Sequence, residues 1–390
     1  MKKYKLVAAF AFIFTTAAAA ANIAYAVSPP FARTDEEWQK LRDNKLEYGE
    51  IAGLIKEYNP TVQDNQIKFF RFKKDYGIKN SEVSDAYKKM AEDILKDIDE
   101  GDPDSPSYAS QRATAQQSKV QADNLLKSAD DTLEDAEIYR LNYENTEMQL
   151  VQLAQNNFLS YFSKQLTVEK AKADKEFAKS KLETVKAKLA AGAATQVEVL
   201  DAQEALIKGE QAETDAQSAV NTVKQKLIIS CGWAYNAEPE FGEIPELDLS
   251  RIDAMNPTAD LEKALANNYT LKVNERKLAN ASSQTQKDTQ NNAISSNKSN
   301  IASSVTEAYQ NVITARDAYT YANTNSQLQK SNLETAKKRY SLGAISLIDL
   351  KKQENDTINA EIAYKQSVYA LQTAISAYEW TINGLAKATS

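Results

Sequence analysis

The chain has 390 residues, of which only ten are glycine and eight are proline. Sandwiches, barrels and doubly wound sheets need a glycine or proline in a turn about every ten residues, which is far more than this chain has. This composition excludes those folds and predicts an all-α protein. A single Cys231, no histidine and a net charge of −7 argue against a disulfide, a metal or cofactor site, an enzyme and nucleic-acid binding.

The N-terminal segment, residues 1–26, is typical of a secretory signal peptide. Lys2, Lys3 and Lys5 precede a mostly apolar stretch, residues 6–21, and Ala24-Tyr25-Ala26 resembles a cleavage site. We therefore expect the protein to be exported across the cytoplasmic membrane into the cell envelope. An uncleaved N-terminal anchor is the alternative interpretation.

The rest of the chain divides into four predicted segments. In order, they are an N-terminal helical segment (27–106), a first long antiparallel helical hairpin with its tip at Gly192 (107–231), an acidic connector containing prolines and one short edge strand (232–257), and a second long hairpin with its tip at Gly343 (258–390).

Two uninterrupted runs without Gly or Pro, 107–191 and 258–342, predict very long helices. Asn and Ser can also interrupt helices, and the best candidate for a hidden break is residues 291–300. The apolar positions recur every three, four or seven residues, as in coiled coils, but the seam is narrow and rich in alanine. Helices of this kind need neighbours, so we expect association with further copies of the chain.

The two halves of the chain repeat each other. With an offset of 151 in residue number, Gly192 falls on Gly343 and Leu182–Lys186 falls on Leu333–Lys337, which is evidence for duplication. Further upstream, Tyr58–Val62 matches Asn267–Leu271 with a larger offset of 209. The first half therefore carries an insertion, which we expect to include one short helix and an acidic loop between residues 77 and 107.

The two glycine-centred turns are the candidate functional site. Each follows a helix that ends in cations, each has a glycine suited to a left-handed helix terminus, and each continues with a hydroxyl cap and an acid three residues later. Apolar residues sit where a solvated loop would be polar, which suggests a partner, although two ordinary capped bends would show the same local signals. The candidate partner-binding residues are Gly192, Ala193, Ala194, Thr195, Val197, Glu198, Val199, Gly343, Ala344, Ile345, Ser346, Leu347, Asp349 and Leu350.

The sequence Lys-Arg-Tyr-Ser-Leu-Gly-Ala-Ile-Ser-Leu-Ile-Asp-Leu (338–350) resembles the tip motif of the TolC-like outer-membrane efflux proteins, and residues 189–203 are a looser copy. The resemblance implies a homotrimer in which each repeat supplies one hairpin of a twelve-helix tube. It also implies that the tips dock on an adaptor (membrane fusion) protein that serves an inner-membrane transporter, in an efflux pump or a type I secretion system.

The sequence departs from that family where its members insert membrane-spanning strands. The corresponding stretches, 107–150 and 280–305, lack the alternating apolar pattern that such strands need, so we expect a member without these insertions. Two other classes stay open: a secreted coiled-coil scaffold or envelope spacer that transports nothing, and, less favoured, the adaptor class itself. Glu198 and Asp349 could form an acidic ring in a trimer, but helix capping alone explains their positions.

Overall fold

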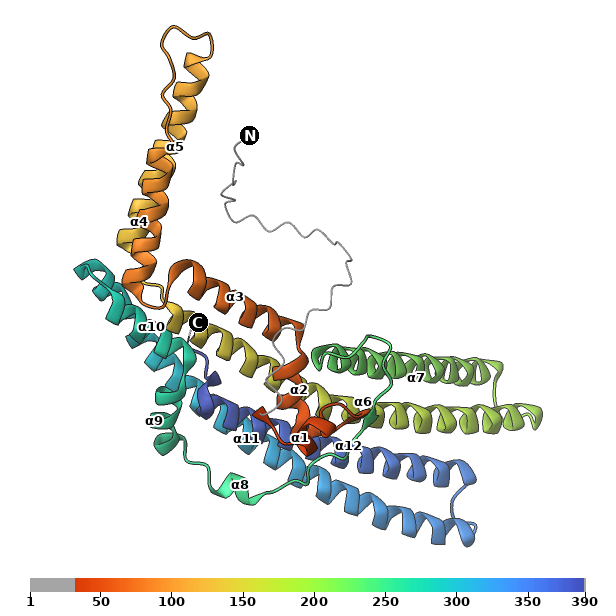
Figure 1. Cartoon of the computed structure of the whole chain (residues 1–390). Helices are drawn as coiled ribbons and strands as arrows, with labels where there is room; N and C mark the ends of the chain where they lie inside the picture. Colours follow the sequence, from red (N-terminus) through yellow and green to blue (C-terminus); the bar gives the residue numbers. More distant parts are fainter. Residues whose placement is uncertain (1–31, 389–390) are drawn as a thin grey trace.

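The computed structural model describes residues 32–388, and the predicted signal peptide lies outside this range. The described chain is almost entirely helical, which confirms the all-α prediction (Figure 1). The elements are α1 (Asp35–Lys40), β1 (Lys45–Leu46), η2 (Tyr48–Glu50), α2 (Ile51–Tyr58), α3 (Pro60–Tyr76), α4 (Asn80–Lys96), α5 (Tyr108–Asp131), α6 (Ala136–Ala190), α7 (Gln196–Ser230), β2 (Glu240–Phe241), α8 (Ser250–Asp253), α9 (Pro257–Asn267), α10 (Tyr269–Asn280), α11 (Gln284–Ser341), α12 (Leu347–Trp380) and η3 (Thr381–Leu385).

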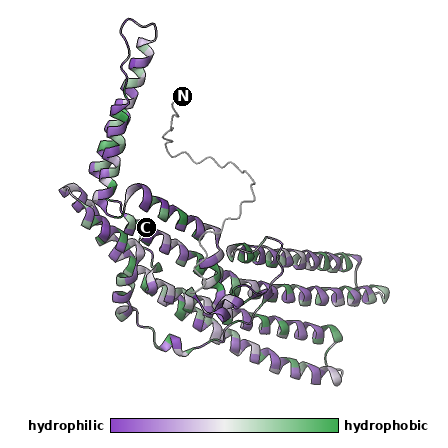
Figure 2. Ribbon diagram, in the orientation of Figure 1, coloured by the Kyte–Doolittle hydropathy of each residue, from purple (hydrophilic) through white to green (hydrophobic). Residues whose placement is uncertain are grey.

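The long helices lie side by side in one layer. α6 pairs with α7, α11 pairs with α12, and α6 packs against α12, so the order across the layer is α7, α6, α12, α11 (Figure 1). Toward the other end, α6 lies between α3 and α10, and α10 packs on α11. Figure 2 shows polar and apolar residues interleaved along every rod, as expected for helices that bury only a narrow seam.

A small core joins the N-terminal segment to the middle of this layer. Leu46, Ile55 and Phe158 are fully buried there, with Leu227 from the end of α7. β1 pairs in parallel with β2, Leu46 opposite Phe241, so the connector contributes the short strand that its sequence predicts.

The expected break at residues 291–300 is wrong, because this stretch continues without interruption inside α11. The long runs are divided elsewhere, between α5 and α6 and on either side of α10. Ser283 caps α11 through a reciprocal capping box with Gln286, which provides the local signal for a helix start at that position.

The insertion in the first repeat forms a helical hairpin, which we call the α4–α5 arm (residues 80–131). It occupies the position that the short turn 281–283 occupies between α10 and α11 in the second repeat. The arm includes the predicted short helix and acidic loop, but it also takes in α5. The predicted boundary at residue 106 therefore falls within a pair of helices that pack on each other. Within residues 32–388, no helix combines the length and the apolar character needed to cross a membrane.

Two buried asparagines at equivalent places in the repeats organise the helix joints. Asn59 caps α3 through its Oδ1 and donates from Nδ2 to the carbonyl of Ser230, 2.7 Å away. Asn268 caps α10 in the same way, and its Nδ2 donates to the carbonyls of Gly384 and Ala386, at 3.3 and 2.8 Å. Each amide thus satisfies the start of one helix and the end of another.

We predict that Asn268→Ala lowers the free energy of unfolding by about 2–4 kcal/mol, because it removes a helix cap and leaves buried carbonyls without a donor. Asn256→Ala is the matched control: Asn256 is an exposed N-cap of α9, so only about 1 kcal/mol should be lost. Urea denaturation measures both variants. Equal losses would show that the bonds to the 384–386 segment contribute nothing.

Candidate functional site at the hairpin tips

The first tip is a helix terminus closed by glycine. α6 ends at Ala190, and Gly192 adopts a φ of 71°, in the left-handed region. The amides of Gly192 and Ala193 donate to the carbonyls of Leu189 and Lys188, at 2.9 and 2.8 Å, which satisfies groups that the helix end leaves open. A β-carbon at Gly192 would meet nothing within 4 Å, so the backbone conformation, not space, requires glycine here.

The second tip repeats this geometry. Gly343 has a φ of 70°, its amide donates to Tyr340 at 2.9 Å, and the amide of Ala344 donates to Arg339 at 2.8 Å. The internal duplication found in the sequence therefore holds at the level of single hydrogen bonds.

Both acids of the tips act as helix caps. The Glu198 carboxylate accepts from the Thr195 amide at 2.6 Å, and the Asp349 carboxylate accepts from the Ser346 amide and hydroxyl, at 3.1 and 2.6 Å. These hydrogen bonds lower the pKa of both carboxyl groups. The capping box expected at the first tip is present, and the second tip has one as well.

The two tips lie next to each other at one end of the layer (Figure 1). The pKa of Asp349, on the second hairpin, is lowered mainly by its hydrogen bonds with Ser346. The positive charge of Lys188, on the first hairpin, lowers this pKa further. The structure therefore brings both sets of candidate residues into one surface.

The tip surface exposes large apolar side chains. Leu342 is 82% exposed and Leu347 is 54% exposed, and Val197 and Leu200 are exposed on the first tip. Leu200 and Leu342 were not among the candidate residues. Leu342 directly precedes the tip glycine, which is the signal that could have identified it.

Not every candidate residue is available to a partner. Val199 is buried against Leu182 and Ala202 in the seam of the first hairpin, and Leu350 is buried in the second. Ile345 and Ala194 are half-buried. The remaining candidates, Gly192, Ala193, Thr195, Val197, Glu198, Gly343, Ala344, Ser346, Leu347 and Asp349, are exposed.

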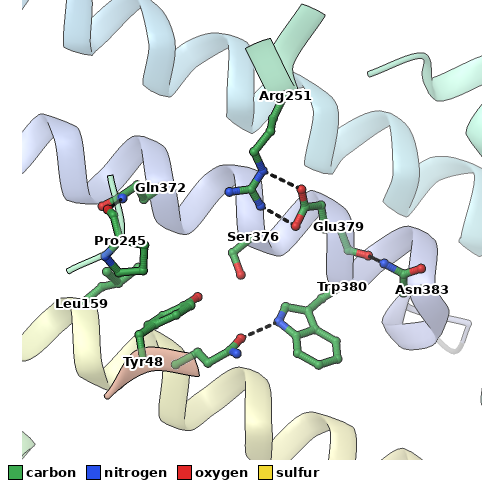
Figure 3. A pocket seen from close by; sticks show the side chains of 10 residues that line it. Tyr48, Leu159, Pro245, Arg251, Gln372, Ser376, Glu379, Trp380 and Asn383 are labelled. Atoms are coloured by element: carbon green, nitrogen blue, oxygen red, sulfur yellow. Dashed lines mark hydrogen bonds and ion pairs between the residues drawn. The ribbon is translucent and has the colours of Figure 1, made fainter. Parts of the chain in front are cut away.

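A cavity of about 260 Å³ lies in the middle of the layer, between α6, α12 and the connector (Figure 3). Arg251 donates to both carboxylate oxygens of Glu379, at 2.9 and 2.5 Å, and the Trp380 indole donates to Gln155 at 3.1 Å. The Arg251–Glu379 pair joins the connector to the second hairpin, and the Trp380–Gln155 bond joins the two hairpins. The cavity is thus a joint between segments, and the tips remain the stronger candidate site.

No protein-family model and no curated relative matches the sequence. Solved structures do match: the outer-membrane channel OprN (TM-score 0.57, 13% identity, 89% of this chain and 92% of that chain), CmeC of Campylobacter jejuni (0.52, 14%, 90% and 88%) and MtrE of Neisseria gonorrhoeae in its open state (0.53, 12%, 87% and 89%). All three are described as outer-membrane channels, not enzymes. The chain therefore has the TolC-like fold of outer-membrane efflux channels, as its tip motif predicts.

Proposed function

We propose that this protein is the duct of an export system in the cell envelope. Three exported copies would close side by side into a helical tube, and the hairpin tips would dock on an adaptor protein that connects the tube to an inner-membrane transporter. The shared fold of outer-membrane channels supports the duct, and the number of copies follows from the resemblance of the tip motif.

The observation that carries the proposal is that the helical layer has two open edges with apolar stripes. At the tip end, α7 packs on α6 and α11 packs on α12, which leaves the outer side of each without a neighbour among the described long helices. Val197, Leu200 and Ile207 follow each other at helical spacing along α7, and all are exposed; Tyr321 and Leu328 do the same along α11. Apolar stripes on the flanks of rods are typical of interfaces between copies.

The two stripes also lie at the same level. The number of residues from Gly192 to Ile207 equals the number from Leu328 to Gly343. Because the two tips lie side by side, both side chains sit roughly 20 Å above the tips at about 1.5 Å per residue. Rotation about a common axis would bring α7 of one copy against α11 of the next, with Ile207 facing Leu328.

The tips supply the second part of the proposal. Their exposed apolar side chains lie at the far end of long rods, and glycine turns and capping boxes hold them in place. A rigid apolar end surface is suited to contact a complementary apolar surface of an adaptor. In the trimer, six such tips would form one ring.

We predict that the double variant Ile207→Cys/Leu328→Cys forms disulfides between copies under mild oxidation, giving covalent species of up to three chains on a non-reducing gel. Ile207→Cys/Ile358→Cys is the matched control, because Ile358 is exposed on α12, which is not an edge helix. The native Cys231 should not interfere, since burial raises the pKa of its thiol to about 12. A stable monomer without cross-links would contradict the tube and favour the envelope spacer.

We further predict that Leu342→Asp/Leu347→Asp abolishes export in the native host and leaves the melting temperature unchanged, because both side chains are exposed. A photoreactive benzoyl-phenylalanine at position 342 should capture an adaptor protein, identified by mass spectrometry. Tyr235→Asp/Leu249→Asp, with the same added charge on exposed sites far from the tips, should export normally. Normal export by the tip variant would contradict docking, and a large fall in melting temperature would show that these leucines belong to the core.

A further inference from the structure

The α4–α5 arm projects from the layer at the end opposite the tips and packs against little of the body. α5 packs on α4, and α4 reaches the body mainly through α3 (Figure 1). The buried residues of the two helices are Val83, Ala91, Ala115, Ala122 and Ala129; Val83 packs at the base against Phe72 and Ala136 of the body, which leaves alanines alone for the rest of the pair. At the same time Met90, Leu95, Val120 and Leu126 are exposed. A helix pair with so small a seam gains little stability in water and is suited to pack on another surface.

The base of the arm is firmly fixed to the body. Asn80 donates to the carbonyls of Thr132 and Glu134, at 2.9 and 3.1 Å, which closes the start and end of the arm. Asp135, fully buried, caps α6 and accepts from Arg276 and Asn280 of α10, at 2.5 and 2.9 Å. The arm therefore has a set direction and is not a loose linker.

That direction takes the arm past the open edge of the layer. The arm rises on the α3 side and points away from α10 and α11 (Figure 1). Ile67 and Phe70 are exposed on α3 itself, so this edge also carries exposed apolar side chains near the base of the arm. In a closed ring, the α11 side of the next copy would meet this α3 edge.

We propose that the arm is a clasp that lies across the α10–α11 corner (residues 269–300) of the neighbouring copy. This inference rests on the proposed tube. Within one copy, Gln286 and Asn280 of the corner donate to the carbonyls of Asp131 and Leu133 at the base of the arm, so the arm and the corner are at one level. Rotational symmetry places the neighbour's corner at this level too. α5 has 24 residues, about 36 Å, which is enough to cross two or three helices packed about 10 Å apart.

The charges of the two surfaces are complementary. The arm, residues 80–131, has twelve acids and six Lys or Arg, whereas the corner has five Lys or Arg and two acids in a chain that is acidic overall. Arg276 and Lys277 of the corner pair with Asp135 and Glu134 of their own copy, which leaves Lys272, Lys287 and Lys298 for a neighbour. Lys287 and Lys298 of the corner are exposed. Opposite net charge favours this pairing and disfavours contact between two arms.

The test is zero-length carbodiimide cross-linking, which joins carboxylates to lysines in direct contact, on full chains mixed from unlabelled and ¹⁵N-labelled protein. We expect mixed-isotope cross-links from arm acids to Lys287 or Lys298, and we expect the total yield of mixed-isotope links from the arm to fall at least fivefold in Lys287→Gln/Lys298→Gln. If Ile207→Cys/Leu328→Cys links the copies but no mixed-isotope link leaves the arm, the clasp is overturned and the tube stands. If neither link forms, both proposals fail.

A second variant tests the contribution of the arm to assembly. Because the two ends of the arm meet at its base, residues 79–134 can be replaced by Ser-Ser, which copies the short turn of the second repeat. We expect a moderate fall in melting temperature, because the replacement removes the hydrogen bonds at the base of the arm and the buried Val83. We expect the dissociation constant of the assembly to rise at least tenfold, with a weaker dependence on salt. An unchanged dissociation constant would overturn the clasp, as would cross-links from the arm to lipid or to another protein.

Discussion

The structure depends on how little a long, thin helix can bury by itself. Each long helix carries a narrow seam of alanine, valine and isoleucine, and this seam is buried from water only when another helix lies along it. Lateral pairing therefore decides the architecture: α6 with α7, α11 with α12, and α6 with α12. A layer built in this way has two flanks, and the flank helices α7 and α11 keep apolar side chains on their outer sides. The duct proposed here is the consequence of continuing the same packing into the next copy.

The joints between rods solve a second problem, which is how to end one helix and begin the next without leaving buried polar groups unpaired. Asn59 and Asn268 do so with a single side chain each, because an amide can accept from a helix start and donate to another segment at once. Asp135 performs the corresponding task at the base of the arm, using a carboxylate whose charge Arg276 of the other repeat neutralises and to which Asn280 donates a hydrogen bond. Duplication thus preserved the joints more faithfully than the lengths of the helices.

The repeats differ mainly at the end opposite the tips. A short turn in the second repeat, 281–283, corresponds to the whole α4–α5 arm in the first. The two are hydrogen-bonded to each other, because Asn280 and Gln286, on either side of the turn, donate to the carbonyls of Leu133 and Asp131 at the base of the arm. An insertion at a closed base leaves the rods undisturbed, because the chain enters and leaves at one place. This explains how one end of the molecule diverged while both tips kept the same hydrogen bonds.

The sequence by itself determined the helical class, the duplication and the position and geometry of both tips, because glycine, hydroxyl caps and acids act within a few residues of one another. The match of Tyr58–Val62 with Asn267–Leu271 also placed Asn59 and Asn268 at equivalent positions, whereas their role as joints came from the structure. Only the tertiary structure decided which tip residues are available, since burying Val199 and Leu350 while exposing Leu342 depends on how the two helices of each hairpin pack on each other. It likewise decided that residues 291–300 stay helical and that α5 pairs with α4, because packing along a rod outweighs the weak local preference of Asn and Ser for a break.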